Sequence, residues 1–194
     1  GVQSYLVQGV RKAGKNNAAL LQPTLLLELI TYHNPQKNLQ RLKEYHPANS
    51  NTSTEENIVR HCIALFSVEL ISKLLPEHAP MPDLFHFCFE YFRYLQKQEG
   101  VALANAPLYF LVHLSRLLGY ELKGNYCDET PYLNLEEGGF SHDMPKIDAG
   151  ITTEVATCLD EINNMVSKQE LDSVKLNASA RYRLIDWYLE FLHT

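Results

Sequence analysis

Signature motifs of common enzyme families are absent from this sequence. It contains no GxSxG nucleophile elbow, no GxxxxGK phosphate loop, no GxGxxG turn and no HExxH metal pair. Eight histidines are present, but His61, His86 and His113 fall in three separate predicted helices, where partly buried or surface histidines are the ordinary finding. We therefore expect neither catalytic residues nor a cofactor.

Cysteine is scarce in this chain. The four cysteines stand at wide spacings without a CxxC pair, which favours reduced thiols over a disulfide framework. Cys127 and His142 bracket the central loop and are candidate zinc ligands. A closed zinc site needs four ligands at paired short spacings, yet Thr130 and Pro145 occupy the positions three residues on. The sequence therefore predicts that no metal is bound.

Long apolar runs are missing as well. The longest candidate, residues 63–75, is interrupted by four polar residues: Ser67, Glu69, Ser72 and Lys73. No run approaches the roughly 18 residues that cross a bilayer. No basic residues precede an apolar stretch at the front, as they do in a signal peptide. We expect no membrane contact and a cytoplasmic location.

Charge is unevenly distributed along the 194 residues. Residues 1–50 hold six basic and two acidic side chains, for a net charge of +4. Residues 51–194 hold 11 basic and 21 acidic side chains, for a net charge of −10. A polyanion is therefore expected to meet the front segment, while the acidic remainder suits protein partners better.

Residues 1–46 are predicted to form three short strands, the first and third from alternation of polar and apolar residues and the second from its content of Leu, Ile, Thr and Tyr. They cover about 2–10, 24–33 and 39–45, with a turn signal at residues 34–37. Three such strands leave sheet edges and half a core uncovered, so the front segment is expected to be incomplete by itself. A polar linker over residues 47–52 follows.

After the linker the apolar period changes from 2 to 3.6, which predicts a helical domain over residues 53–194. A capping box, Ser53-x-x-Glu56, is expected to start the first helix, and Pro76 to stop it. The fold class that results is α+β, with a strand segment in front of a larger all-α part.

Proline and glycine set the expected limits of the later helices. Pro82 starts a second helix with Gly100 beyond its end, and Asn105 with Pro107 opens a third that Gly119 stops. A loop-rich insertion is expected at about residues 120–150. Two more helices should follow it, over about 153–166 and 177–193.

Two surface features are open to more than one interpretation. The loop after the first strand carries Arg11, Lys12 and Lys15, which suits contact with single-stranded nucleic acid, although exposed loop cations are usually only solvated. Aromatic residues surround the predicted second helix, which indicates packing on both sides or a groove for a partner peptide. They are Phe85, Phe87, Phe89, Tyr91, Phe92 and Tyr94.

Several short stretches follow one another in a distinctive order along nearly the whole chain. They are YLVQGVRK at 5–12, AALLQP at 18–23, LLEL at 26–29, LYFL at 108–111, LLGY at 117–120, the Cys127 loop, and GGF at 138–140. In this order they resemble the RecO family of bacterial recombination mediators. The resemblance implies a partial N-terminal OB-fold β-barrel, entered at about its third strand, followed by a helical domain that the chain leaves before its usual end.

The resemblance also implies a function in DNA repair and homologous recombination. Members bind single- and double-stranded DNA, RecR and the single-strand-binding protein, anneal strands, and help load the recombinase at gaps and breaks. Arg11, Lys12 and Lys15 would then form part of the DNA face, and Arg93 and Arg116 would steer the acidic tail of the single-strand-binding protein. The location implied is the cytoplasm, at the nucleoid.

Two departures and two alternatives accompany the resemblance. Zinc-binding members carry four cysteines in the central loop, whereas this chain matches only at Cys127, with His142 near the third position. The acidic helical part is poorly suited to wrapping DNA. One alternative is a helical protein–protein adaptor without direct DNA binding. The other, a metal-dependent enzyme, needs ligands that the sequence does not supply.

Overall fold

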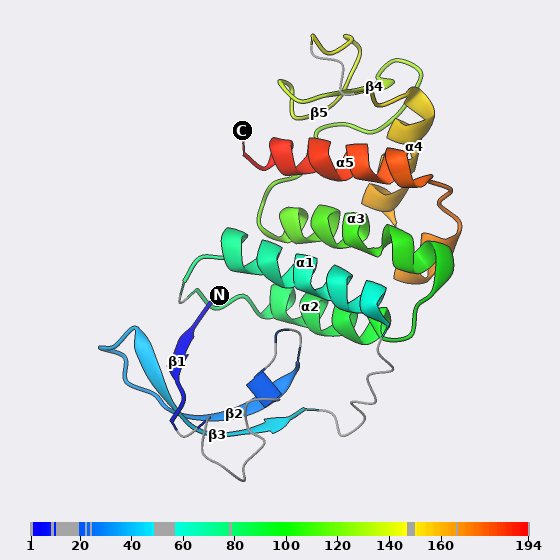
Figure 1. The fold of residues 1–194 in the computed structure, drawn as a ribbon. Helices are drawn as coiled ribbons and strands as arrows, with labels where there is room; N and C mark the ends of the chain where they lie inside the picture. The colour runs from blue at the N-terminus through cyan, green and yellow to red at the C-terminus, as the bar shows by residue number, and fades with distance from the viewer. Residues whose placement is uncertain are drawn as a thin grey trace. The chain divides into compact units, whose positions relative to one another are not determined.

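The computed structural model in Figure 1 describes residues 2–8, 10, 20–21, 23, 25–48, 57–77, 79–146, 150–165 and 167–193. The chain divides into two compact units, Gly1–Phe92 and Arg93–Thr194, and each is described by itself.

The first unit opens with a three-stranded sheet, which confirms the three predicted strands. Its strands are β1 (Ser4–Leu6), β2 (Leu27–Tyr32) and β3 (Leu39–Pro47). β3 lies in the middle, antiparallel to β2 and parallel to β1. Along β3, Gln40 and Leu42 are buried while their neighbours are exposed, as the alternating sequence predicts.

A hydrogen-bonded turn fixes how β2 pairs with β3. Lys37 N donates to Asn34 O at 3.1 Å, and Gln36 N donates to Asn34 Oδ1 at 2.9 Å. The buried Gln40 side chain holds the same turn, because its Oε1 accepts from Asn34 N at 2.8 Å. Further along, the register shifts between Ile30 and Thr31, so that Lys43 has no opposite residue on β2. Such a bulge bends a strand and redirects the side chain it carries.

Two helices complete the first unit, the second of them reaching into the next. α1 spans Ile58–Leu74, and α2 spans Pro82–Leu95. The N-cap of α1 is Asn57, whose Oδ1 accepts from Val59 N and Arg60 N at 3.0 and 3.3 Å. The helix thus begins at Ile58, and the predicted capping box, Ser53-x-x-Glu56, lies outside the described residues. α1 stops just before Pro76, as predicted, because proline has no N–H to continue the helix.

The core of the second unit is α3 (Gly100–Leu117). Leu108, Phe110, Leu111 and Leu114 have no exposed surface, and most residues between Ala102 and Ser115 are buried, so this helix is surrounded by other segments. The predicted start at Asn105 is wrong, because α3 begins one and a half turns earlier, and Pro107 lies inside it. The stabilisation from burying this helix outweighs the loss of the one backbone hydrogen bond that Pro107 cannot donate.

Three segments pack against α3: α4 (Thr153–Asn164), the short 3-10 helix η2 (Lys168–Asp172) and α5 (Ala178–Phe191). Asn105 on α3 is fully buried and donates to Leu171 O and Val174 O at 3.0 and 2.9 Å. Ser115 Oγ lies 2.8 Å from Tyr188 Oη, which ties α3 to α5. Buried polar groups with matched partners of this kind set how the segments align.

The region 120–150, predicted to be a loop, contains a β-hairpin. Its strands are β4 (Tyr132–Asn134) and β5 (Gly139–Ser141), paired antiparallel. At the base of the hairpin Phe140 N donates to Lys123 O at 2.9 Å, and Lys123 N donates to Gly138 O at 3.1 Å. Strands of three residues are too short for an alternating pattern to reveal them.

The fold class is therefore α+β, with a helical part larger than the strand part. The front strands form an open sheet, and the described residues contain no closed barrel. Among the helices of the described ranges, none is long and apolar enough to cross a membrane.

Candidate nucleic-acid interface

One exposed face of the front sheet brings together an arginine, a tyrosine and a leucine. Arg41 on β3 is paired with Tyr32 on β2 and with Leu6 on β1. Residues that pair directly across strands point to the same face of a sheet. Tyr32 and Leu6 are 56% and 48% exposed, so the three side chains form a solvent-facing row, here called the Leu6–Arg41–Tyr32 row.

The guanidinium of Arg41 lies over the Tyr32 ring, with its Cζ atom 6.0 Å from the ring centroid. Its Nη2 donates to Oε1 of Gln8, two residues after the end of β1, at 2.9 Å. This exposed pairing orders the arginine without removing it from solvent. The planar groups of arginine and tyrosine offer stacking surfaces for bases, and the guanidinium offers donors for phosphate.

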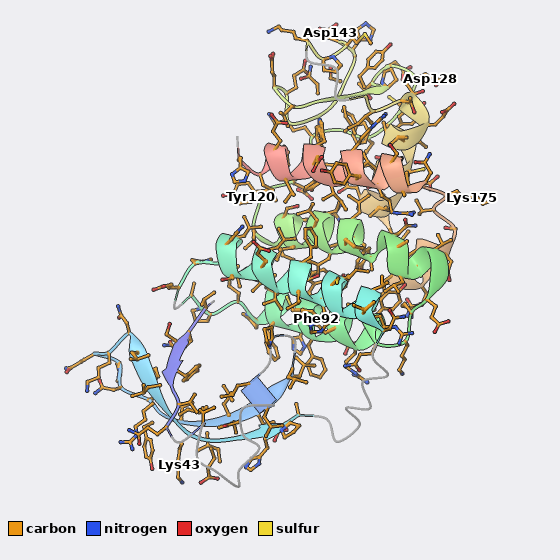
Figure 2. All side chains as sticks on the ribbon, in the orientation of Figure 1. Lys43, Phe92, Tyr120, Asp128, Asp143 and Lys175 are labelled. Carbon is orange, nitrogen blue, oxygen red and sulfur yellow. The ribbon has the colours of Figure 1, made fainter. Side chains whose placement is uncertain are left out.

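A second cation, Lys43, stands two residues along β3 at the bulge; it is labelled on the sheet in Figure 2. Its Nζ lies 3.5 Å from Glu44 Oε1, and both side chains are about half exposed, at 47% and 49%. An exposed ion pair of this kind is weak, so a phosphate can compete for the ammonium group. The row and Lys43 together place aromatic and cationic groups on the sheet, beside the carboxylate of Glu44, which pairs with Ile30 on the same face as Tyr32.

The predicted DNA-binding residues Arg11, Lys12 and Lys15 lie outside the described residues. They belong to the connection between β1 and β2, the two strands that flank β3. Tyr32 and Arg41 were not predicted as a site, because their pairing depends on a strand register that the sequence does not specify.

The two cations predicted to bind partners differ in their surroundings. Arg93 on α2 is exposed. Arg116 on α3 is not isolated, because its Nη2 donates to the carbonyl oxygen and to Oδ1 of Asn163, the latter at 2.9 Å. Its buried Nε lies 3.4 Å from Glu121 Oε1. Arg116 thus joins α3 to the end of α4, and an acidic partner has to compete with these contacts.

The candidate zinc ligands make ordinary loop contacts. Cys127 Sγ lies 3.0 Å from Thr130 Oγ1, and His142 Nδ1 lies 3.0 Å from Glu129 O. In the part of the chain that the structure describes, no three His, Cys, Asp or Glu side chains converge as metal ligands do. Cys127 and His142 thus make hydrogen bonds within the loop, whereas a closed zinc site would need four ligands.

Aromatic residues of α2 divide between buried and exposed positions. Tyr91, Phe92 and Tyr94 are buried, whereas Phe85 is 62% exposed and lies 6.2 Å from the Phe89 ring, centroid to centroid. Most of the aromatic run therefore packs, as the first of the two interpretations predicts.

Comparisons with known proteins give a consistent result. Residues 55–131 match the family described as "Recombination protein O C terminal". A "DNA repair protein RecO" from Christiangramia forsetii is 28% identical over 142 residues, which are 72% of this chain and 58% of that protein.

Two further relatives carry the same description. One, from Flavobacterium psychrophilum, is 26% identical over 147 residues, 73% of this chain and 59% of the relative. The other, from Bacteroides fragilis, is 32% identical over 120 residues, 61% of this chain and 49% of the relative. The match thus covers less than two thirds of the length of each of these relatives.

Proposed function

Because this chain is a relative of the RecO DNA repair proteins, as its sequence predicted, we propose that it mediates DNA repair and homologous recombination. In this proposal it binds single- and double-stranded DNA through the front sheet and binds RecR and the single-strand-binding protein through its helical part. It acts by making contacts, without bond-changing chemistry, in the cytoplasm at the nucleoid.

The Leu6–Arg41–Tyr32 row is the observation that carries the DNA-binding proposal. Proteins that hold single strands combine aromatic stacking with cations that follow the backbone, and the row offers both on one exposed sheet face. Arg11, Lys12 and Lys15 extend this cationic character along the connection that leaves β1.

The strand directions support an OB-fold for the front segment as part of the same proposal. Five strands cannot alternate in direction all the way around a closed ring, so a five-stranded barrel requires at least one parallel pair. The parallel pairing of β1 with β3 is of this kind. β1 and β2 form the two edges of the sheet, where two further strands would close it.

The division into a strand segment over residues 1–46, a linker over 47–52 and a helical part over 53–194 also belongs to the proposal. The helical part is acidic, which favours protein over DNA as its partner. For the acidic tail of the single-strand-binding protein, both predicted cations belong to the proposal: Arg93 is exposed, and Arg116 contacts Asn163 and Glu121.

A salt titration of binding to fluorescent oligo(dT) tests the proposal. We expect Tyr32→Ala to weaken binding by about 1–3 kcal/mol, the cost of losing one stacked base. Replacing Arg11, Lys12 and Lys15 together by alanine should flatten the slope of log affinity against log salt by about 2, since each phosphate contact contributes about 0.7. Lys175→Ala, an exposed cation in the second unit, is the matched control and should change neither.

The outcomes separate this function from its alternative. If the unaltered chain does not bind oligo(dT) at low salt, the protein is better explained as a helical adaptor without direct DNA contact. If it binds but Tyr32→Ala and Lys175→Ala behave alike, the sheet face is not the contact surface. A longer chain with a completed barrel provides the same comparison at higher affinity.

A further inference from the structure

The sheet face that carries the Leu6–Arg41–Tyr32 row has more exposed apolar surface than the row alone. Leu39 lies two residues before the arginine on β3, and Ile30 lies two residues before the tyrosine on β2, so both point to the same face. They are 52% and 49% exposed. The row, Leu39, Ile30 and Glu44 are here called the row face. An exposed apolar cluster with charged side chains around it is typical of an interaction surface.

The row face is the outer face of the front sheet. Gln40 and Leu42 on β3 are buried and point to the opposite side. Further strands that close the sheet, as the proposed function supposes, extend it from its edges β1 and β2 around these two buried side chains. The row face therefore stays on the outside of a closed barrel, where its apolar side chains remain in contact with solvent.

The charged side chains of the row face follow a fixed order along the strands. Arg41 stands opposite Tyr32 on β2, and beyond the bulge Glu44 stands opposite Ile30. The face thus has a cationic level and an anionic level, and each level places an apolar or aromatic side chain beside the charged one. A surface with the same two levels in the reverse order complements both of them.

The charges on the three front strands balance. The strands hold two cations, Arg41 and Lys43, and two carboxylates, Glu28 and Glu44. Lys43 Nζ lies 3.5 Å from Glu44 Oε1, but this exposed pair is weak, and a carboxylate can accept from a second cation. Among protein partners, a balanced surface of this kind favours one that also presents both signs over a strongly acidic or basic one.

We propose that the row face binds the row face of a second copy of this chain. Two sheets pack face to face about 10 Å apart, with their strands nearly aligned. A two-fold axis that lies between the sheets and crosses the strands between the two levels reverses the order of the levels in the second copy. Arg41 of each copy then faces Glu44 of the other, and Tyr32 of each faces Ile30 of the other. Contacts repeated in this way by a two-fold axis are the commonest kind in homodimers.

Self-association goes beyond the proposed DNA binding and restricts it, because both use Arg41 and Tyr32. A face buried between two copies cannot stack on bases, so a chain that is paired in this way cannot hold a single strand on the row. The second copy thus covers the apolar face while no nucleic acid is bound, and a single strand has to displace it.

Sedimentation equilibrium of the full chain without DNA measures the association. The contact is small, so we expect reversible pairing at about 10 µM to 1 mM protein. Arg41→Glu and Glu44→Arg should each weaken it about tenfold, because each places like charges opposite one another at both symmetry-related contacts. Lys175→Glu makes the same change of charge at an exposed position of the second unit and is the control, which should leave the association unchanged.

A mixture of the two charge-reversed variants is the sharper test. Arg41→Glu leaves a carboxylate at both positions, and Glu44→Arg leaves a guanidinium at both. Each variant alone therefore brings like charges together, whereas a mixed pair brings opposite charges together at both contacts. We expect the mixture to associate about as strongly as the unaltered chain and more strongly than either variant by itself.

Three results would overturn the proposal. The first is an unaltered chain that keeps the mass of a single copy up to about 1 mM. The second is a mixture that associates no better than either variant alone. The third needs no substitution: amide chemical shifts that change with protein concentration, but not in residues 28–32 and 39–46, would place the contact on another surface. DNA is absent from these measurements, so the proposal can fail while oligo(dT) binding holds, and the reverse.

Discussion

The hydrogen bonds of Asn105 should make a large contribution to the stability of the second unit. Its side chain is fully buried and donates two hydrogen bonds, to Leu171 O and Val174 O. Its Oδ1 accepts a third from Arg181 Nη1, at 3.2 Å. In Asn105→Ala all three are lost, and the two carbonyl groups stay buried, since Leu171 and Val174 are 0% and 1% exposed.

The magnitude follows from these contacts. A buried polar group left without a partner costs about 1–3 kcal/mol, so the two carbonyl groups should together cost about 2–6 kcal/mol. Arg181 Nη1 keeps its hydrogen bond to Leu176 O and adds little to this cost. That is a large share of the roughly 5–15 kcal/mol by which a domain is stable. Urea unfolding of the full chain followed by Trp187 emission measures it, because Trp187 is buried in the same unit.

A matched control distinguishes the network from asparagine in general. Asn164 on α4 is exposed, and its amide donates only to Asp160, at 3.0 Å. Asn164→Ala should therefore change the free energy of unfolding by less than about 0.5 kcal/mol. If Asn105→Ala costs less than about 1 kcal/mol, the claim that these bonds join α3 to the segment around η2 is wrong.

Three further predictions concern the second unit. Burial, with a smaller effect of the Arg116 charge, lowers the pKa of His113 to about 4 from 6.5, so the folded chain keeps this imidazole neutral. The neutral imidazole contributes its full stability above about pH 6.5, and this contribution falls as the pH drops toward 4. The unaltered chain should therefore lose roughly 2 kcal/mol of unfolding free energy through His113 between about pH 7 and pH 5, and His113→Gln should remove this loss. An unchanged pH dependence in the variant would contradict the prediction. Gly139→Ala should destabilise the hairpin by about 1–3 kcal/mol, because the added Cβ would lie 2.2 Å from Lys123 O. Amide exchange at Phe140 should then be faster than in the unaltered chain, and equal exchange rates would contradict this prediction. Elemental analysis should find no zinc, since Cys127 and His142 contact Thr130 and Glu129; about one equivalent per chain would show otherwise.

The elements with a strong local signal were predicted correctly from the sequence. Alternation identified β1 and β3, enrichment in Leu, Ile, Thr and Tyr identified β2, and the resemblance to RecO is confirmed. α1 stops before Pro76, because a proline there prevents continuation whatever the tertiary packing. The start of α3 was wrong for the opposite reason: Pro107 is tolerated inside a helix that the surrounding segments bury on every side.

The candidate sites depended on pairing, which a sequence without its register does not specify. Tyr32 and Arg41 are nine positions apart, and only the turn held by Asn34 and Gln40 places them opposite one another. DNA contact by Arg11, Lys12 and Lys15 stays a prediction.

The joined base of the β4–β5 hairpin has a consequence for how this region can change in evolution or by design. Residues 124–138 leave and re-enter the unit at nearly one point, because Lys123 bonds both Gly138 and Phe140. A segment whose ends already touch can be lengthened, shortened or exchanged at small entropic cost, about 0.6 kcal/mol for each doubling of its length. The segment can therefore gain or lose a ligand-binding insert, or accept a grafted epitope, while the three helices beneath it keep their sequence. It is an exchangeable module, and Gly139 at its base must stay small, because an added Cβ would lie 2.2 Å from Lys123 O.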